Sequence, residues 1–313
     1  MELAPIILFV YNRPWHTQQT LIALAQNHLA SESILYIYAD GPKNDASPEV
    51  LEKIKETRNV IRQQQWCKEV HIVESEENKG LADSVIQGVT ETVNKYGKVI
   101  VLEDDLITSP FFLHYMNEGL EMYQSVSNVY AINGYMFSVD TAEIDTFLCP
   151  LATSSWGWGT WTEKWKAFDR DTTYKSIIQK NPLIRQRFNF ADYDYAAMLD
   201  NTNSWAIRWY YSVFMRNGLG LFPSKSLVKN IGVDGSGVHS DIETDETFPQ
   251  ELFLEKIPLI YKDSINIYFY DKLLERFLDN KRNVEEEETA KSGDKVDNNI
   301  FKSLMKKIVG SFL

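Results

Sequence analysis

The sequence predicts an α/β fold, a mostly parallel sheet with helices on both faces. Continuous apolar runs of strand length alternate with helical patterns, and polar or turn residues stand at the end of each run. Strands that are apolar throughout, rather than at every second position, are typical of parallel sheets buried on both faces. Any ligand site is therefore expected beyond the carboxyl ends of these strands.

The first third of the chain supplies the regular elements. Four predicted strands occupy Ile6–Tyr11, Ile34–Ala39, Glu69–Val73 and Lys98–Leu102. Helical patterns separate them, one opening at Thr17 and two more covering about 48–65 and 81–95. This alternation of strand and helix predicts the parallel arrangement.

From about Val129 the chain is less regular and rich in aromatic residues. Short strands and loops packed on the sheet are expected here. Six tryptophans fall within fewer than sixty residues, at Trp156, Trp158, Trp161, Trp165, Trp205 and Trp209. Trp161 and Trp165 are spaced i and i+4, which favours a place for both in the core.

The end of the chain reads as a linker followed by a helix. Residues 280–299 are polar and include the acidic run from Glu285 to Glu288, which predicts a flexible acidic linker. In residues 300–313, apolar side chains recur at helical spacing with lysines beside them, which predicts a basic amphipathic helix. Such a helix can lie on an anionic membrane. The alternative is that it docks on this protein or on a sister subunit.

Composition excludes several classes of protein. The 313 residues carry 32 Lys and Arg against 44 Asp and Glu, and a net charge of −12 gives no general reason to bind nucleic acid. An N-terminus without a basic leader and the absence of a long apolar run predict a cytoplasmic protein. Cys67 and Cys149 lie far apart without metal-ligand spacing, so both are expected to be buried or half-buried thiols.

The strongest chemical signal is the acidic run Glu103-Asp104-Asp105 directly after the fourth strand. Three adjacent carboxylates repel one another and need a compensating cation. Carboxylates in this position can hold Mg²⁺ or Mn²⁺, which is otherwise coordinated by water and by substrate phosphates. The alternative is a set of solvated acids near a helix that begins at Ser109-Pro110.

The other strand ends are polar too. Asn12 and Arg13 follow the first strand, Asp40 follows the second, and Asn78-Lys79-Gly80 follows the third. Because carboxyl ends of parallel strands meet at one edge of a sheet, these residues are expected to line one crevice with the acidic run.

Taken in order, these motifs make the chain resemble GT-A type glycosyltransferases over roughly residues 5–240. It is most similar to bacterial cell-surface polysaccharide glycosyltransferases related to N-acetylglucosaminyltransferase I, whose metal motif also reads Glu-Asp-Asp-Leu. The matching segments are Tyr11–Pro14, Asp40–Pro42, Asn78–Leu81, Glu103–Leu106 with Ser109-Pro110, Trp156–Gly159 and Gly235–His239.

The resemblance implies a Mn²⁺ or Mg²⁺ cofactor and a donor site. Asp105 would ligate the metal, Arg13 and Asp40 would hold base and ribose, and Asp104 would touch ribose or donor sugar. The full donor set is Asn12, Arg13, Asp40, Asn78, Lys79, Gly80, Asp83, Glu103 and Asp104. The glycine-rich segment 230–239 would act as a lid, and its His239 would complete the metal or diphosphate site.

The acceptor and the general base are predicted less directly. Acceptor-binding candidates are Trp156, Trp158, Trp205 and Arg208. In the related enzymes an Asp follows a Trp at a helix start, but here Ala206 follows Trp205 and cannot act as a base. Either the role has moved to Asp194, Asp200 or Asp234, or the enzyme retains configuration.

The predicted function is metal-dependent transfer of a hexosyl or N-acetylhexosaminyl group from a nucleotide-diphosphate sugar, UDP being favoured. The acceptor would be a lipid-linked saccharide in surface polysaccharide synthesis. The transfer would invert the configuration of the sugar, and the enzyme would lie at the inner face of the cell membrane. Residues 1–128 would bind the donor and 129–279 the acceptor. The alternatives are a sugar-phosphate nucleotidyltransferase, which usually has a glycine-rich loop after its first strand, and a non-catalytic carbohydrate-binding protein, which would leave the acidic run unexplained.

Overall fold

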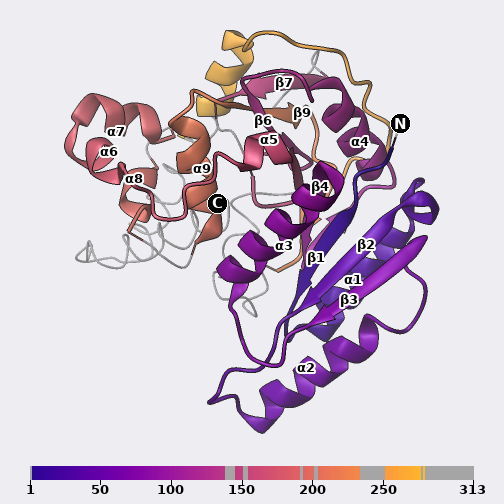
Figure 1. Cartoon of the computed structure of the whole chain (residues 1–313). Helices are drawn as coiled ribbons and strands as arrows, with labels where there is room; N and C mark the ends of the chain where they lie inside the picture. The colour runs from indigo at the N-terminus through magenta and orange to yellow at the C-terminus, as the bar shows by residue number, and fades with distance from the viewer. Residues whose placement is uncertain are drawn as a thin grey trace, which may run out of the picture.

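The computed structural model describes residues 2–137, 145–150, 154–190, 193–200, 204–232, 251–275 and 278. Within them the largest sheet has eight strands in the order β3-β2-β1-β4-β8-β6-β9-β7 (Figure 1). Strands β1 (Ile6–Val10), β2 (Ile34–Ala39), β3 (Glu69–Glu74) and β4 (Lys98–Glu103) are mutually parallel. The strands predicted in the first third of the chain are therefore confirmed.

The second half of the chain extends this same sheet. Its strands are β6 (Val129–Asn133), β7 (Thr146–Cys149), β8 (Trp158–Trp161) and β9 (Leu219–Pro223). Strand β8 runs antiparallel to β4 and β6, β9 runs parallel to β6, and β7 runs antiparallel to β9. The expectation that short strands pack on the sheet is wrong, because β8 pairs with β4 and continues the hydrogen-bond ladder.

Helices cover both faces of the sheet, which confirms the predicted fold class. One face carries α1 (Pro14–Ala25), α2 (Pro48–Val60) and α4 (Phe112–Met122), and the other carries α3 (Leu81–Tyr96), α5 (Thr162–Trp165) and α9 (Trp205–Phe214) (Figure 1). The side chain of Asn27, two residues after α1, accepts a hydrogen bond from the Leu113 backbone and so joins the end of α1 to α4. On the opposite face, Gly88 of α3 packs against the Phe9 ring.

Smaller elements complete the described part of the chain. They are the 3-10 helix η1 (Ala30–Glu32), helices α6 (Lys175–Lys180), α7 (Pro182–Phe188) and α8 (Tyr195–Met198), and the antiparallel pair β5 (Leu106–Thr108) and β10 (Val228–Asn230). Helices α6, α7 and α8 form a group beyond α9 at the left of Figure 1. The predicted linker 280–299 and helix 300–313 lie outside the described residues. The predicted boundary at 128/129 falls inside one continuous sheet.

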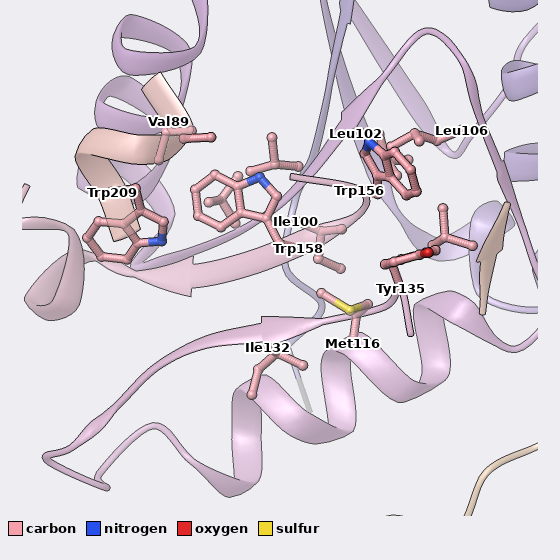
Figure 2. Close-up of a cluster of buried hydrophobic side chains, with 14 of the residues drawn as sticks. Val89, Ile100, Leu102, Leu106, Met116, Ile132, Tyr135, Trp156, Trp158 and Trp209 are labelled. Atoms are coloured by element: carbon pink, nitrogen blue, oxygen red, sulfur yellow. The ribbon is translucent and has the colours of Figure 1, made fainter. Parts of the chain in front are cut away.

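The tryptophan-rich segment builds the core between the sheet and α9. Trp158 of β8 has no exposed surface, and its ring stacks on Trp205 with centroids 5.1 Å apart. Figure 2 shows the Trp158 ring between Trp209 and Ile100. Trp161 and Trp165 are also buried, as predicted.

Cys67 and Cys149 are both buried, in agreement with the expectation of buried or half-buried thiols. Among the described helices, none is long and apolar enough to cross a bilayer.

Replacing Trp158 tests this core. We expect Trp158→Ala to lower the free energy of unfolding by about 3–5 kcal/mol, because it removes a fully buried aromatic ring and leaves a cavity. Leu183→Ala is the control, since Leu183 is 77% exposed and its loss should change stability by no more than about 0.5 kcal/mol. Denaturant unfolding followed by tryptophan fluorescence measures both, and equal effects would contradict the assignment of Trp158 to the core.

Candidate functional site

The topology brings the acidic run next to Arg13. From β1 the chain passes through α1 to β2 on one side, and it later returns through α3 to β4 on the other side of β1. Residues that follow β1 and β4 therefore meet where the strand order reverses, which is the usual place for ligands in open α/β sheets. Asn12 and Arg13 follow β1, and Asp104 and Asp105 follow β4.

An ion pair joins these two strand ends. The Arg13 Nη2 atom donates to Asp105 Oδ2 at 2.9 Å, and Arg13 Nε lies 3.8 Å from Asp104 Oδ1. All three side chains are largely buried, with exposed fractions of 17%, 12% and 12%. Arg13 is thus the protein's own compensating cation for the acidic run.

One guanidinium does not neutralise three carboxyl groups. Burial raises the pKa of Asp104 to about 7, although Arg13 acts in the opposite direction. Burial, with the charges of Asp105 and Asp104, raises the pKa of Glu103 to about 8. The Trp205 indole makes a hydrogen bond to Glu103, which connects the start of α9 to this site. Near neutral pH both carboxyl groups therefore hold protons, and a bound cation would stabilise their ionised forms.

Asp105 also offers a free ligand atom. Its Oδ1 is buried and has no hydrogen-bond partner in the described part of the chain, whereas its Oδ2 contacts Arg13. No group of three or more His, Cys, Asp or Glu side chains able to hold a metal occurs among the described residues. Mg²⁺ commonly takes only one or two carboxylates and completes its coordination with water and phosphate. Asp105 fits that mode of binding; His239 lies outside the described residues.

Asp40 has a different place from the one predicted. Its Oδ1 accepts hydrogen bonds from the backbone N–H groups of Gly41 and Lys79, both at 2.9 Å. Its Oδ2 accepts from Asn78 Nδ2 and from the Gly80 N–H, again at 2.9 Å. These four donors occupy all of the lone-pair sites, about four, that a carboxylate offers. Asp40 therefore stabilises the loop before α3 through these hydrogen bonds, and direct binding of base or ribose by this side chain is not supported.

Two glycines allow the loop after β2 and the loop before α3 to approach each other closely. A Cβ atom on Gly41 would lie 2.6 Å from backbone atoms of Glu77, so the two loops meet as closely as glycine allows. Gly80 has φ 78° and ψ 157°, a conformation that essentially only glycine adopts, and it begins α3 in open space. Asn78, Lys79 and Gly80 thus form an ordered edge of the predicted crevice.

The remaining donor candidates lie nearby. Asn12 occupies the bend after β1. Lys79 directs its Nζ to Gln87 Oε1 at 3.2 Å, and Asp83 in the first turn of α3 pairs with Arg170 at 2.7 Å. Both members of that second pair are more than half exposed. Their roles toward a donor remain predictions.

Gly232 contacts the ion pair, which the sequence did not reveal. A Cβ atom there would lie 2.2 Å from Asp105 Oδ2 and 2.7 Å from Arg13 Nη2. The neighbouring Ile231 N–H donates to the Asp105 carbonyl at 2.8 Å, next to the β10 and β5 pairing. The start of the predicted lid thus lies on the acidic run. Its glycine content was visible in the sequence, but its contact partner was not; residues 233–239, with Asp234 and His239, lie outside the described residues.

The predicted acceptor wall is largely buried. Trp158 has no exposed surface, so its assignment to an acceptor pocket is corrected here to the core. Trp156 is 4% exposed and packs edge-to-face on Tyr135 with centroids 4.6 Å apart, and Trp205 is 3% exposed. An indole needs an open face to stack on a sugar. The structure offers none at Trp158 and very little at Trp156 or Trp205.

Two base candidates lie in the group formed by α6, α7 and α8. Asp194 caps α8 and pairs with Arg185. Asp200 is held by Lys175 at 3.0 Å, and hydrogen bonds from Lys175 and Gln179 lower its pKa. Figure 1 shows α8 across α9 from the sheet. Neither carboxylate is therefore supported as the base, and Asp234 stays a prediction.

No protein-family model matches the chain, and neither does any curated protein. Solved structures with some likeness include S. aureus TarS, with TM-score 0.39 and 10% identity over 72% of this chain and 36% of that one. UDP-glucose pyrophosphorylase complexed with UDP-glucose has TM-score 0.35 and 11% identity over 71% of this chain and 90% of its own. Mycobacterium tuberculosis glucosyl-3-phosphoglycerate synthase with Mn²⁺ and UDP-glucose has TM-score 0.30 and 10% identity over 51% and 57%. At these TM-scores the likenesses carry no argument about this chain.

The raised pKa of Glu103 predicts a dependence of stability on pH. A carboxyl that binds its proton more tightly when folded reduces the free energy of unfolding as the pH rises from its unfolded pKa through its folded pKa. The loss should span the interval from the ordinary value of 4.5 to about 8. Glu103→Gln should flatten part of this slope, because glutamine stays neutral and its oxygen can still accept from Trp205.

Unfolding by denaturant at a series of pH values, with chelator present, measures the slope. Glu163→Gln is the control, because the Glu163 side chain is 76% exposed. A slope that is unchanged in Glu103→Gln would contradict the stated environment of Glu103.

Proposed function

We propose that the protein is a glycosyltransferase of the GT-A type that transfers a sugar from a nucleotide-diphosphate donor with the help of Mn²⁺ or Mg²⁺. The observation that carries the proposal is the Asp105 carboxylate, with one oxygen held by Arg13 and the other buried and unpartnered in the described residues. It stands at the strand-order reversal, where a sheet of this class binds nucleotides.

The chain's own residues supply position and charge. Arg13 fixes the Asp105 carboxylate so that Oδ1 is available, and Gly232 permits the backbone to lie against that pair. The bound cation would stabilise the negative charge that develops on a departing nucleoside diphosphate. Asp40 orders the Asn78-Lys79-Gly80 edge beside the donor. UDP as donor nucleotide, a hexosyl or N-acetylhexosaminyl group and inversion belong to the proposal, with Asp234 as the base.

A sugar-phosphate nucleotidyltransferase is the second candidate, since it would also use metal and nucleotide. The loop after β1 reads Asn12-Arg13-Pro14-Trp15 and contains no glycine to cradle a triphosphate. Arg13 in that loop is already bound to Asp105. Transfer of a sugar is therefore favoured over transfer of a nucleotidyl group.

Asp105→Asn tests the proposal. We expect the wild-type protein to gain several degrees in melting temperature with one nucleoside diphosphate and Mn²⁺, since ligand at about 100 times its Kd adds roughly 2.7 kcal/mol. UDP, GDP, dTDP and CMP are each tested with Mn²⁺ and with chelator. The Asn variant should lose the metal-dependent shift and the sugar transfer while it stays folded.

Asp263→Asn is the matched control, because Asp263 is exposed and its carboxylate contacts its neighbour Ser264. The same shift in Asp105→Asn as in the control would exclude Asp105 as the metal ligand. No shift with any nucleotide in folded wild-type protein would favour a carbohydrate-binding protein instead.

The proposal also includes an acceptor that is linked to a membrane lipid. It is supported by the basic amphipathic pattern of residues 300–313. A helix with apolar and basic faces suits the anionic face of a membrane.

Truncation after residue 299 tests membrane contact. We expect the full chain to co-sediment with vesicles that contain phosphatidylserine, and the truncated chain to do so more weakly, because a helix with apolar and basic faces is lost. Vesicles of phosphatidylcholine alone are the control. Unchanged sedimentation of the truncated chain would contradict a membrane role for 300–313.

A further inference from the structure

Helix α1 directs a buried hydroxyl group toward the acidic run. Thr20 has no exposed surface, and its Oγ1 atom donates a hydrogen bond to the Asp104 carbonyl at 2.8 Å. A threonine in a helix often donates to the carbonyl four residues before it, as Thr17 and Thr57 do here. Thr20 instead bonds to a residue 84 positions along the chain. Its hydroxyl therefore joins α1 to the turn that follows β4.

The two residues of that turn are held in different ways. The Asp104 carboxyl group accepts a hydrogen bond from the Tyr11 backbone, and its carbonyl accepts from Thr20. The Asp105 carbonyl accepts from the Ile231 N–H at 2.8 Å, but its carboxylate Oδ1 has no partner in the described part of the chain. Both peptide carbonyls of the turn are thus fixed, and Asp105 keeps a free oxygen.

A second polar side chain next to α1 holds the chain on the other side of Asp105. Asn27 donates from Nδ2 to Thr108 Oγ1 at 2.9 Å, and both side chains are buried. Thr108 is the last residue of β5, which begins directly after Asp105. Thr20 and Asn27 therefore fix the main chain before and after the proposed metal ligand.

Loss of the Thr20 hydroxyl would affect Asp105 through the backbone. A carbonyl that loses its donor in a buried place carries the cost of desolvation without the compensating hydrogen bond. The turn would then shift until the Asp104 carbonyl finds another donor, and the Asp105 carboxylate would move relative to Arg13. Binding groups must be held to about 0.5 Å for full function, so a small shift of this turn matters.

We propose that Thr20 is a positioning residue: it fixes the turn after β4 so that Asp105 keeps one carboxylate oxygen on Arg13 and presents the other to a cation. Because Thr20 is fully buried, it acts through the Asp104 peptide group and does not touch the ligand. This inference rests on the proposed function for the identity of the ligand, which is Mn²⁺ with a nucleoside diphosphate. The hold on the turn can be measured without that ligand.

Hydrogen exchange of the Ile231 amide in the metal-free protein, followed by NMR, measures the hold on the turn. This amide is bound to the Asp105 carbonyl. We expect it to exchange at least tenfold faster in Thr20→Val than in the wild type, because valine keeps the branched shape but lacks the hydroxyl; tenfold corresponds to about 1.4 kcal/mol. Thr20→Ser should recover most of the protection, because serine keeps the donor.

Thr57→Val is the matched control. Thr57 also has no exposed surface, and its Oγ1 donates at 2.8 Å to the Lys53 carbonyl within its own helix, α2. The control removes the same hydroxyl from the same kind of buried position, but the Ile231 amide should exchange as it does in the wild type. Equal exchange of this amide in Thr20→Val and Thr57→Val would overturn the proposal.

Mn²⁺ titration followed by electron paramagnetic resonance tests the link to Asp105. It is carried out with whichever of UDP, GDP, dTDP and CMP stabilises the wild type. We expect Thr20→Val to bind Mn²⁺ at least tenfold more weakly, Thr20→Ser to recover most of the affinity, and Thr57→Val to bind as the wild type does. A merely structural threonine would lower the melting temperature of both valine variants and leave Mn²⁺ affinity unchanged. Equal Mn²⁺ affinity in wild type and Thr20→Val would therefore overturn the role of Thr20 toward Asp105.

The two measurements separate failure of this inference from failure of the proposed function. Faster Ile231 exchange in Thr20→Val, in a wild-type protein that binds no Mn²⁺ with any of the four nucleotides, would keep the hold of Thr20 on the turn and reject metal-dependent sugar transfer. Mn²⁺ binding by the wild type, with Ile231 exchange unchanged in Thr20→Val, would keep the proposed function and reject the role of Thr20.

Discussion

The contact between Arg13 and Asp105 is the interaction on which the site depends. It joins the loop after β1 to the turn after β4 at 2.9 Å, with both side chains largely buried. Removing one partner of a buried ion pair costs about 3–5 kcal/mol, because the other charge is left uncompensated. The close approach of Gly232 adds a third segment to the same contact. The predicted lid therefore begins at the ion pair.

Burial also determines the charge of this site. Beside β4, burial raises the pKa of Glu103 to about 8 and that of Asp104 to about 7, so both carboxyl groups hold protons near neutral pH. Trp205, at the start of α9, makes a hydrogen bond to Glu103. A bound divalent cation would stabilise the ionised forms of these carboxyl groups.

Much of the fold could be predicted because the first four strands are apolar throughout, and because each ends at a polar residue. The same pattern predicted that Arg13 and Asp105 would share one crevice. The positions of strands β6 to β9 could not be predicted from the sequence. Each is a run of only four or five mostly buried residues, and so short an apolar run shows neither the period of a helix nor that of a strand. Trp158 was misplaced because flanking glycines suggest an open pocket, whereas the ring turns into the core. The role of Asp40 depends on loops 38 to 40 residues away, which no local pattern encodes.

The most direct test of the central claim is a crystal structure grown with Mn²⁺ and UDP, with the metal located by its anomalous scattering. We predict an anomalous peak at about 2.0–2.3 Å from Asp105 Oδ1, with diphosphate oxygens in the same coordination shell and Arg13 still bound to Oδ2. A peak elsewhere, or nucleotide bound with no metal at Asp105, would contradict it.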